Sequence, residues 1–323
     1  MITLEEIKKE VNETPIGFIQ IDTNSVCGSK CWCCPVRYYK RKHVSIMSED
    51  MFESILTQLD EGIKENYVLP SISIWLSSYN DVLHDPFLKD RLDRMRQHGR
   101  QFQLLTNGIN LLKCADLLSE YEDVIHGYSV NLIAGNAEDY AKYTNNDASI
   151  FPQIIKGLNY LYSKNPNRYK QIVSVIVNGV YDDDVAKLQT KIEMPVGDTD
   201  KQMEQLKKLL PYKIFDARPL CDRAGLLKKV NILDNAAVGV REMWKLPVDA
   251  EIADGCNGGS RLYNWIHVTS KGDVYTCCQD YLEKFVWGNL NDNSLKELIF
   301  SDKRSEVILN TLKNLCTQCW FSY

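Results

Sequence analysis

Residues 17–35 read GFIQIDTNSVCGSKCWCCP, an apolar run that leads at once into four closely spaced cysteines. The run from Gly17 to Asp22 holds the aromatic and β-branched residues that buried strands prefer. The cysteines that follow stand at positions 27, 31, 33 and 34. This order predicts a strand whose carboxyl end opens into a loop rich in thiols.

Five more strand-like runs follow along the chain, and segments with helical periodicity separate them. In one such segment the apolar residues Phe52, Ile55 and Leu59 recur on a single helical face. Alternating strands and helices predict a parallel sheet with right-handed crossovers. Six such units predict an α/β fold, a partial (β/α)6 barrel, although an open doubly wound sheet has the same pattern. The further runs are Ser71–Leu76, Gln101–Thr106, Tyr128–Ile133, Gln171–Asn178 and Tyr212–Ala217.

The regular alternation of strand-like and helical segments ends at about residue 218. The runs Tyr263–Thr269 and Asp273–Cys278 flank a Ser-Lys-Gly turn, which predicts a β-hairpin. Two helical patterns follow, at Ser294–Phe300 and Lys303–Leu315. We therefore predict a barrel over residues 1–217 and a small α+β domain over residues 218–323.

The composition narrows the class of protein. The chain has 323 residues, a formal net charge of −5, five histidines and eleven cysteines. No apolar stretch approaches the ~20 residues of a membrane helix, and the N-terminal residues lack the apolar core of a signal peptide. These features predict a cytoplasmic protein without a membrane partner, and the mild acidity argues against a nucleic-acid partner. An odd number of clustered cysteines without an export signal argues for metal or redox chemistry rather than disulfides.

Polar residues follow several predicted strands at their carboxyl ends. In barrel-like sheets these ends meet at one rim, where functional groups collect. We expect the thiol loop to share this rim with Ser77–Asp81 and Thr106–Gly108. Side chains on or after the later strands join them, namely Asn131, Asn178 and Arg218.

The first cysteines have Cys-x3-Cys-x2-Cys spacing at Cys27, Cys31 and Cys34. Three thiolates on a short loop can face one iron–sulfur cube and leave its fourth iron open to a small molecule. Zinc is an alternative, but a structural zinc site needs four closed ligands. Cys33 is a poor fourth ligand because it is the direct neighbour of Cys34. A loop without metal is the remaining alternative.

This motif, placed directly after the first strand of an α/β chain, resembles the radical S-adenosylmethionine (radical SAM) superfamily. The resemblance implies that Cys27, Cys31 and Cys34 hold a 4Fe–4S cluster whose open iron chelates S-adenosylmethionine (SAM). It also implies that SAM is cleaved reductively to a 5′-deoxyadenosyl radical, which abstracts a hydrogen atom from the substrate.

Other segments match the family's SAM-binding elements in part. The segment after the second strand lacks the family's glycines. The resemblance implies that Asp81 takes the acidic role toward the SAM amino group, and the alternative is that Asp81 is a turn residue. Thr106–Gly108 resembles the family's strand-three turn, and Asn131 either approaches the SAM carboxylate or caps its strand. Trp32 either touches the cofactor or packs the loop, and Arg218 binds an anion or bridges the domains. The candidate cofactor-binding residues are Trp32, Asp81, Asn107, Asn131, Asn178 and Arg218.

A second group of cysteines lies near the C-terminus. The hairpin would bring Cys256 and Cys277 together, and the later pair Cys316 and Cys319 could complete a four-thiol site. From spacing alone zinc competes strongly here. The pattern resembles the auxiliary-cluster extension called SPASM, in the shortened form called twitch, because the chain ends soon after Cys319. The resemblance implies one auxiliary 4Fe–4S cluster, with Cys278 as a substitute ligand or a packed thiol.

A cluster ligated by four cysteines has no open iron for a substrate, so we expect it to relay electrons. Oxidation of the substrate radical would then give dehydrogenation or a new bond, as in the twitch-type alcohol dehydrogenases that this chain resembles. The first alternative is epimerisation, in which the thiol of Cys221 or Cys278 returns a hydrogen atom. The second is maturation of a ribosomal peptide, which we expect less because only 26 residues precede Cys27. A non-enzymatic zinc scaffold is the alternative from a different class.

The expected partners follow from this chemistry. The substrate is a small molecule or a peptide. A flavodoxin- or ferredoxin-type protein would supply the electron, and the basic run Arg37, Lys40, Arg41 and Lys42 is either its docking patch or a solvated face.

Overall fold

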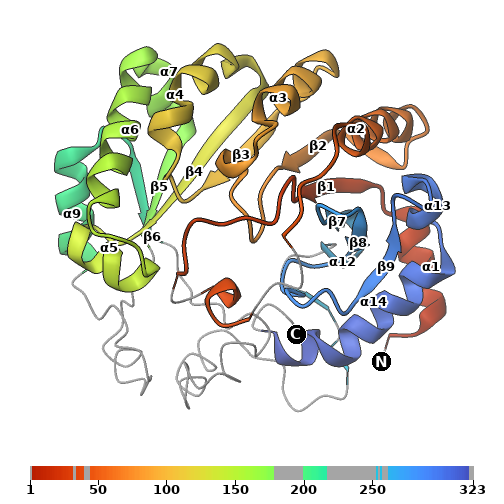
Figure 1. Cartoon of the computed structure of the whole chain (residues 1–323). Helices are drawn as coiled ribbons and strands as arrows, with labels where there is room; N and C mark the ends of the chain where they lie inside the picture. Colours follow the sequence, from red (N-terminus) through yellow and green to blue (C-terminus); the bar gives the residue numbers. More distant parts are fainter. Residues whose placement is uncertain are drawn as a thin grey trace.

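The computed structural model shows an α/β protein whose strands form one continuous sheet (Figure 1). We describe the following residues of it: 2–31, 34–39, 44–177, 199–216, 252–253, 255–256 and 261–319.

Within these residues the sheet has nine strands in the order β6-β5-β4-β3-β2-β1-β7-β8-β9. All pairings from β6 across to β7 are parallel, whereas the pairs β7–β8 and β8–β9 are antiparallel. The described strands leave β6 and β9 at opposite edges, so the predicted barrel is partial. The strands are β1 Ile16–Ile21, β2 Val68–Trp75, β3 Phe102–Thr106, β4 Ile125–Ile133, β5 Val173–Val177, β6 Lys213–Asp216, β7 Trp265–Val268, β8 Asp273–Tyr275 and β9 Val286–Asn289.

Helices follow the strands in the order that the apolar periodicity predicts. In α2 the stripe of Phe52, Ile55 and Leu59 is buried against the sheet, and the side chain of Ser48 caps the first turn by accepting from the Met51 N–H. The α-helices are α1 Leu4–Glu13, α2 Glu49–Lys64, α3 Leu88–Gln97, α4 Leu111–Glu120, α5 Ala137–Thr144, α6 Ile150–Lys164, α7 Pro166–Ile172, α9 Thr199–Leu209, α12 Arg261–Asn264, α13 Leu295–Ile299 and α14 Asp302–Asn314. Short 3-10 helices are η1 Pro35–Arg37, η2 Val82–His84, η3 Glu122–Val124 and η4 Cys316–Gln318. Among the described helices, none has the length and apolar character needed to cross a membrane.

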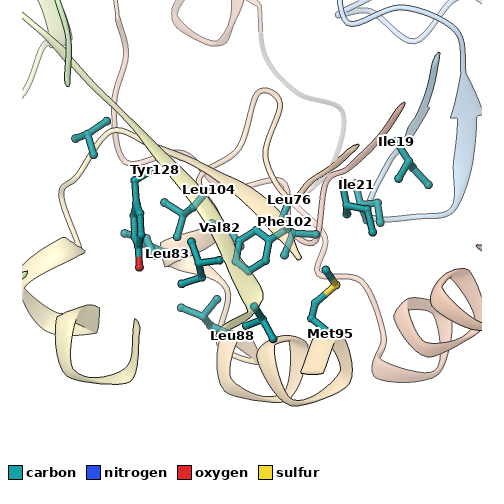
Figure 2. Packing of buried hydrophobic residues seen from close by; sticks show 14 of the residues in the cluster. Ile19, Ile21, Leu76, Val82, Leu83, Leu88, Met95, Phe102, Leu104 and Tyr128 are labelled. Atoms are coloured by element: carbon teal, nitrogen blue, oxygen red, sulfur yellow. The ribbon is translucent and has the colours of Figure 1, made fainter. Parts of the chain in front are cut away.

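The two faces of the sheet carry different residues because side chains alternate along each strand. Aliphatic residues such as Ile19, Ile21 and Leu104 enter the core between the sheet and its helices (Figure 2). Phe18 and Trp265 lie on the opposite, inner face, where their rings stack with centroids 4.0 Å apart. The inner face is therefore aromatic and polar, and it is the face that a partial barrel offers to ligands.

The C-terminal strands extend the barrel sheet. β7 pairs with β1, and the predicted hairpin of β7 and β8 is confirmed, with Gly272 at a φ of 86° in its turn. β9 follows as an additional strand that the sequence pattern did not indicate. The predicted boundary between residues 217 and 218 lies outside the described residues.

The N-terminal helix packs with the C-terminal part of the chain (Figure 1). Ile7 and Val11 of α1 share a small apolar cluster with Ile308 and Leu312 of α14. In the folded protein, therefore, α1 near the N-terminus packs against α14 near the C-terminus.

Candidate active site

The thiol loop lies at the carboxyl end of β1, and three neighbouring segments hold it. The Asp81 N–H, in the loop after β2, donates to the Val26 carbonyl at 2.8 Å. The Lys30 N–H donates to the carbonyl of Thr144 at the end of α5, at 2.9 Å. Within the loop the Cys34 N–H donates to the Cys31 carbonyl at 3.0 Å, which starts the turn into η1. The backbone path of the loop is thus set by its neighbours.

The three cysteines of the Cys-x3-Cys-x2-Cys motif have different surroundings. Burial raises the pKa of Cys27 to about 11, and the negative charges of Asp81 and Cys34 add to the rise. The Asn107 side chain lies with Nδ2 3.7 Å from Cys27 Sγ, within reach of an N–H···S hydrogen bond. Cys31 packs against the main core, whereas Cys34 packs against Tyr79 and Tyr281.

These surroundings fit a bound iron–sulfur cluster. A buried thiolate without a positive partner is unfavourable, and bound iron supplies that charge. Ligating sulfurs also need N–H donors around them, and Asn107 provides one. Among the described residues, no three His, Cys, Asp or Glu side chains lie close enough to hold a single metal ion. The fit therefore rests on the burial of the Cys27 thiol and on the Asn107 donor beside it.

Asp81 ties the loops after β2 and β3 together. Its buried carboxylate accepts from the Thr106 hydroxyl at 2.9 and 3.0 Å and from the N–H groups of Asn107 and Leu83, both at 2.9 Å. Burial raises the pKa of Asp81 and outweighs these hydrogen bonds, which lower it. The contacts correspond to the turn-residue alternative, and the role of Asp81 toward the SAM amino group stays a prediction.

The other predicted cofactor residues divide into two sets. Asn131 lies on β4 between the core residues Val130 and Leu132, so its side chain belongs to the inner face of the sheet. Trp32, Asn178, Arg218 and Cys221 lie outside the described residues, and their roles stay predictions.

The structure brings the four C-terminal cysteines into one region. All four thiol residues, Cys256, Cys277, Cys316 and Cys319, are buried. Cys256 and Cys316 share one apolar cluster, and the Cys319 N–H donates to the Cys316 carbonyl at 3.0 Å. A hydrogen bond with Cys278 and burial raise the pKa of Cys277 well above its usual range, and the charge of Cys319 raises it further. This arrangement can hold a second cluster shielded from water.

Cys278 lies beside these four residues. It is half-buried, and its Sγ accepts from Gln279 Nε2 at 3.8 Å. Its roles as substitute ligand or hydrogen-atom donor stay predictions.

Two tyrosines that the sequence motifs did not single out connect the two groups of cysteines. The Tyr79 hydroxyl donates to the Cys278 carbonyl, and the Tyr281 hydroxyl donates to the Tyr39 carbonyl at 3.0 Å. The two rings meet edge to face with centroids 4.7 Å apart, directly against Cys34. Cysteine spacing carries no signal for this contact, because it joins residues far apart in the chain.

Comparison with protein families identifies both parts of the chain. The radical SAM superfamily model matches residues 21–192, and the SPASM model, an iron–sulfur cluster-binding domain, matches residues 256–320. None of the curated proteins matches the sequence.

Several solved structures share the fold. BtrN in complex with AdoMet and 2-DOIA is 18% identical, with a TM-score of 0.55, over 94% of this chain and 92% of its own. Native anSMEcpe with bound AdoMet is 17% identical, with a TM-score of 0.57, over 94% of this chain and 88% of its own. Streptococcus suis SuiB bound to the precursor peptide SuiA is 13% identical, with a TM-score of 0.55, over 97% of this chain and 73% of its own.

These matches agree with the motif, the partial barrel and the two groups of cysteines, and they favour iron–sulfur clusters over zinc at both. The chain belongs to the radical SAM superfamily, with a C-terminal SPASM domain, and its cofactors are SAM and 4Fe–4S clusters.

Proposed function

We propose that this protein is a radical SAM oxidoreductase that removes two electrons from its substrate. The first cluster and SAM, when bound, supply a 5′-deoxyadenosyl radical. One hydrogen atom of the substrate would pass to that radical, which would become 5′-deoxyadenosine. The auxiliary cluster, when bound, would accept the second electron and a base would take a proton, so that a dehydrogenated product or a new bond would result.

The burial of the four C-terminal cysteines is the observation that supports oxidation best. Four thiolate ligands would leave no iron open to a substrate, so the site is suited to take up an electron rather than to bind a ligand. The Tyr79–Tyr281 contact supports the same role, because it joins this site to the Cys34 end of the first loop.

The substrate class is either a small molecule or a peptide. The BtrN structure contains 2-DOIA, while SuiB was captured with its precursor peptide SuiA and anSMEcpe with the Cp18Cys peptide. The inner face around Phe18 and Trp265 offers stacked rings, which suit the flat apolar faces of either class. An electron donor of the flavodoxin or ferredoxin type would reduce the first cluster.

Product analysis tests this proposal. The protein is reconstituted anaerobically with iron and sulfide and given SAM and deuterated candidate substrates. Deuterium in 5′-deoxyadenosine identifies the abstracted atom, and a product lighter by a pair of hydrogen atoms supports oxidation. A product of unchanged mass that gains one solvent deuteron would instead establish epimerisation, and Cys221→Ala should then abolish its formation.

A further inference from the structure

His84 contributes a buried ring nitrogen that has no hydrogen-bond partner among the described residues. The atom is Nε2, and it is shielded from solvent. His84 ends η2, the short helix directly after Asp81. A buried polar atom without a partner costs free energy, typically about 1–3 kcal/mol, so a group bound beside Nε2 that pairs with it would remove this cost.

The neighbouring Asn110 determines which ring nitrogen carries the proton. Asn110 Nδ2 lies 3.2 Å from His84 Nδ1 and 3.1 Å from the Leu83 carbonyl oxygen. An amide nitrogen can only donate, and the carbonyl contact orients it, so Nδ1 accepts. In the neutral ring the proton then sits on Nε2, which makes the buried atom a donor.

This donor lies against the thiol loop. A Cβ added to Gly28 would lie 2.8 Å from His84 Nε2, closer than real side chains allow. Only glycine therefore lets the imidazole reach the residue directly after Cys27. The loop after β3 supplies a second donor beside Cys27, because Asn107 Nδ2 lies 3.7 Å from Cys27 Sγ.

We propose that His84 donates an Nε2–H···S hydrogen bond to the first cluster, either to the Cys27 thiolate or to an adjacent sulfide. Hydrogen bonds to cluster sulfurs stabilise the added negative charge of the reduced form, and they are one of the protein's means of setting the reduction potential. His84 would thus keep the reduction potential of this cluster less negative through a direct hydrogen bond. The inference needs the first cluster alone and does not depend on whether the substrate is oxidised.

The test is a redox titration of the reconstituted full-length protein, monitored by electron paramagnetic resonance without any substrate. The first cluster is recognised by the part of the spectrum that changes when SAM is added. We compare His84→Phe, which keeps a flat ring without a donor, with His84→Gln, whose amide nitrogen can stand in for Nε2. His126→Asn is the matched control, because His126 is exposed at the amino end of β4.

We expect the midpoint potential of the first cluster to become more negative in His84→Phe and to stay near the wild-type value in His84→Gln and His126→Asn. The potential of the auxiliary cluster should not move in any variant. If His84→Phe binds less iron than the wild type, His84→Asn serves as the donor-free variant instead, because its shorter amide does not reach Gly28. An unchanged potential in the donor-free variant overturns the proposal, as does an equal shift in His84→Gln.

Discussion

Single side chains around Cys27 show how much of this site depends on atoms outside the cysteine motif. Asp81 orients the loop that carries Asn107, and Asn107 in turn approaches the Cys27 thiol. Each contact is a hydrogen bond to a buried group, so loss of one partner leaves the other unsatisfied. The effects of substitutions here should therefore exceed those of surface substitutions.

The two groups of cysteines should differ in which step they control. We expect Cys27→Ala to abolish 5′-deoxyadenosine formation, because the motif loses a ligand of the cluster that binds SAM. Cys277→Ala should retain 5′-deoxyadenosine formation but lose the oxidised product. Mass spectrometry of both compounds separates the two outcomes.

Cys114→Ala is the matched control for these variants, because Cys114 is half-buried in α4 and belongs to neither group. It should behave like the wild type. Oxidised product from Cys277→Ala at the wild-type yield would contradict an electron-accepting role for the auxiliary site.

Asp81→Asn should destabilise the protein. The amide replaces one acceptor oxygen with a donor, which then faces the donors of Thr106 and Asn107. We expect a loss of ~1–3 kcal/mol in the free energy of unfolding, measured by urea denaturation of the iron-free protein. Asp292→Asn, at an exposed position, is the control, and equal losses in both variants would refute the role of Asp81.

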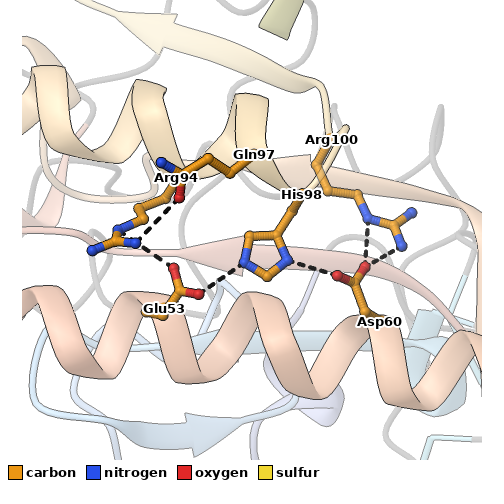
Figure 3. A network of polar contacts seen from close by, with 6 residues as sticks. All are labelled: Glu53, Asp60, Arg94, Gln97, His98 and Arg100. Atoms are coloured by element: carbon orange, nitrogen blue, oxygen red, sulfur yellow. Dashed lines mark hydrogen bonds and ion pairs between the residues drawn. The ribbon is translucent and has the colours of Figure 1, made fainter.

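At the scale of elements, the contact between α2 and the end of α3 combines packing with charge (Figure 3). His98 lies between two acidic residues of α2, with Nδ1 2.6 Å from Asp60 and Nε2 3.1 Å from Glu53. Arg100 also binds Asp60, with Nε at 3.0 Å. Burial lowers the pKa of His98, but the two carboxylates outweigh burial and raise the pKa overall.

This contact predicts a pH-dependent contribution to stability. Because the pKa of His98 is higher in the folded state, its contribution is complete below the unfolded pKa of about 6.5 and is lost as pH rises through the folded pKa. We expect His98→Gln to cost about 1 kcal/mol at mildly acidic pH and less at alkaline pH. Urea denaturation at both pH values measures this, and a cost that does not change with pH would rule out the charged contact.

At the scale of the whole molecule, one sheet carries both cysteine groups. β7 pairs directly with β1, and the loop after β2 meets the loop after β8 through Tyr79 and Tyr281. The C-terminal strands thus extend the barrel sheet, and a small aromatic core of Tyr79 and Tyr281 packs against Cys34 and reaches the Cys278 carbonyl.

Removal of the Tyr281 ring should weaken the packing around Cys34 and around the loop that carries Tyr281. We expect Tyr281→Ala to lower the free energy of unfolding by about 3 kcal/mol or more, and to accelerate loss of iron to a chelator. Tyr281→Phe keeps the ring and removes the hydroxyl that donates to the Tyr39 carbonyl, so its iron release should stay near wild type. Equal iron release in Tyr281→Ala and wild type would show that the contact does not support the clusters.

Several elements of the fold could be predicted because their residues carry a local signal. The run Gly17–Asp22 corresponds to β1, Ile16–Ile21, and the apolar stripe of Phe52, Ile55 and Leu59 corresponds to the buried face of α2. The strand β9 could not be predicted in this way, since Gly288 and Asn289 at its end are turn-forming residues.

What the sequence determined by itself is the order of strands and helices and the cysteine motif, because periodicity and spacing are properties of neighbouring residues. Only the tertiary structure placed α1 against α14, Tyr79 against Tyr281 and His84 against Gly28. Each of these contacts joins segments that are distant in the chain, and burial and hydrogen bonding select them only when the sheet brings their loops together.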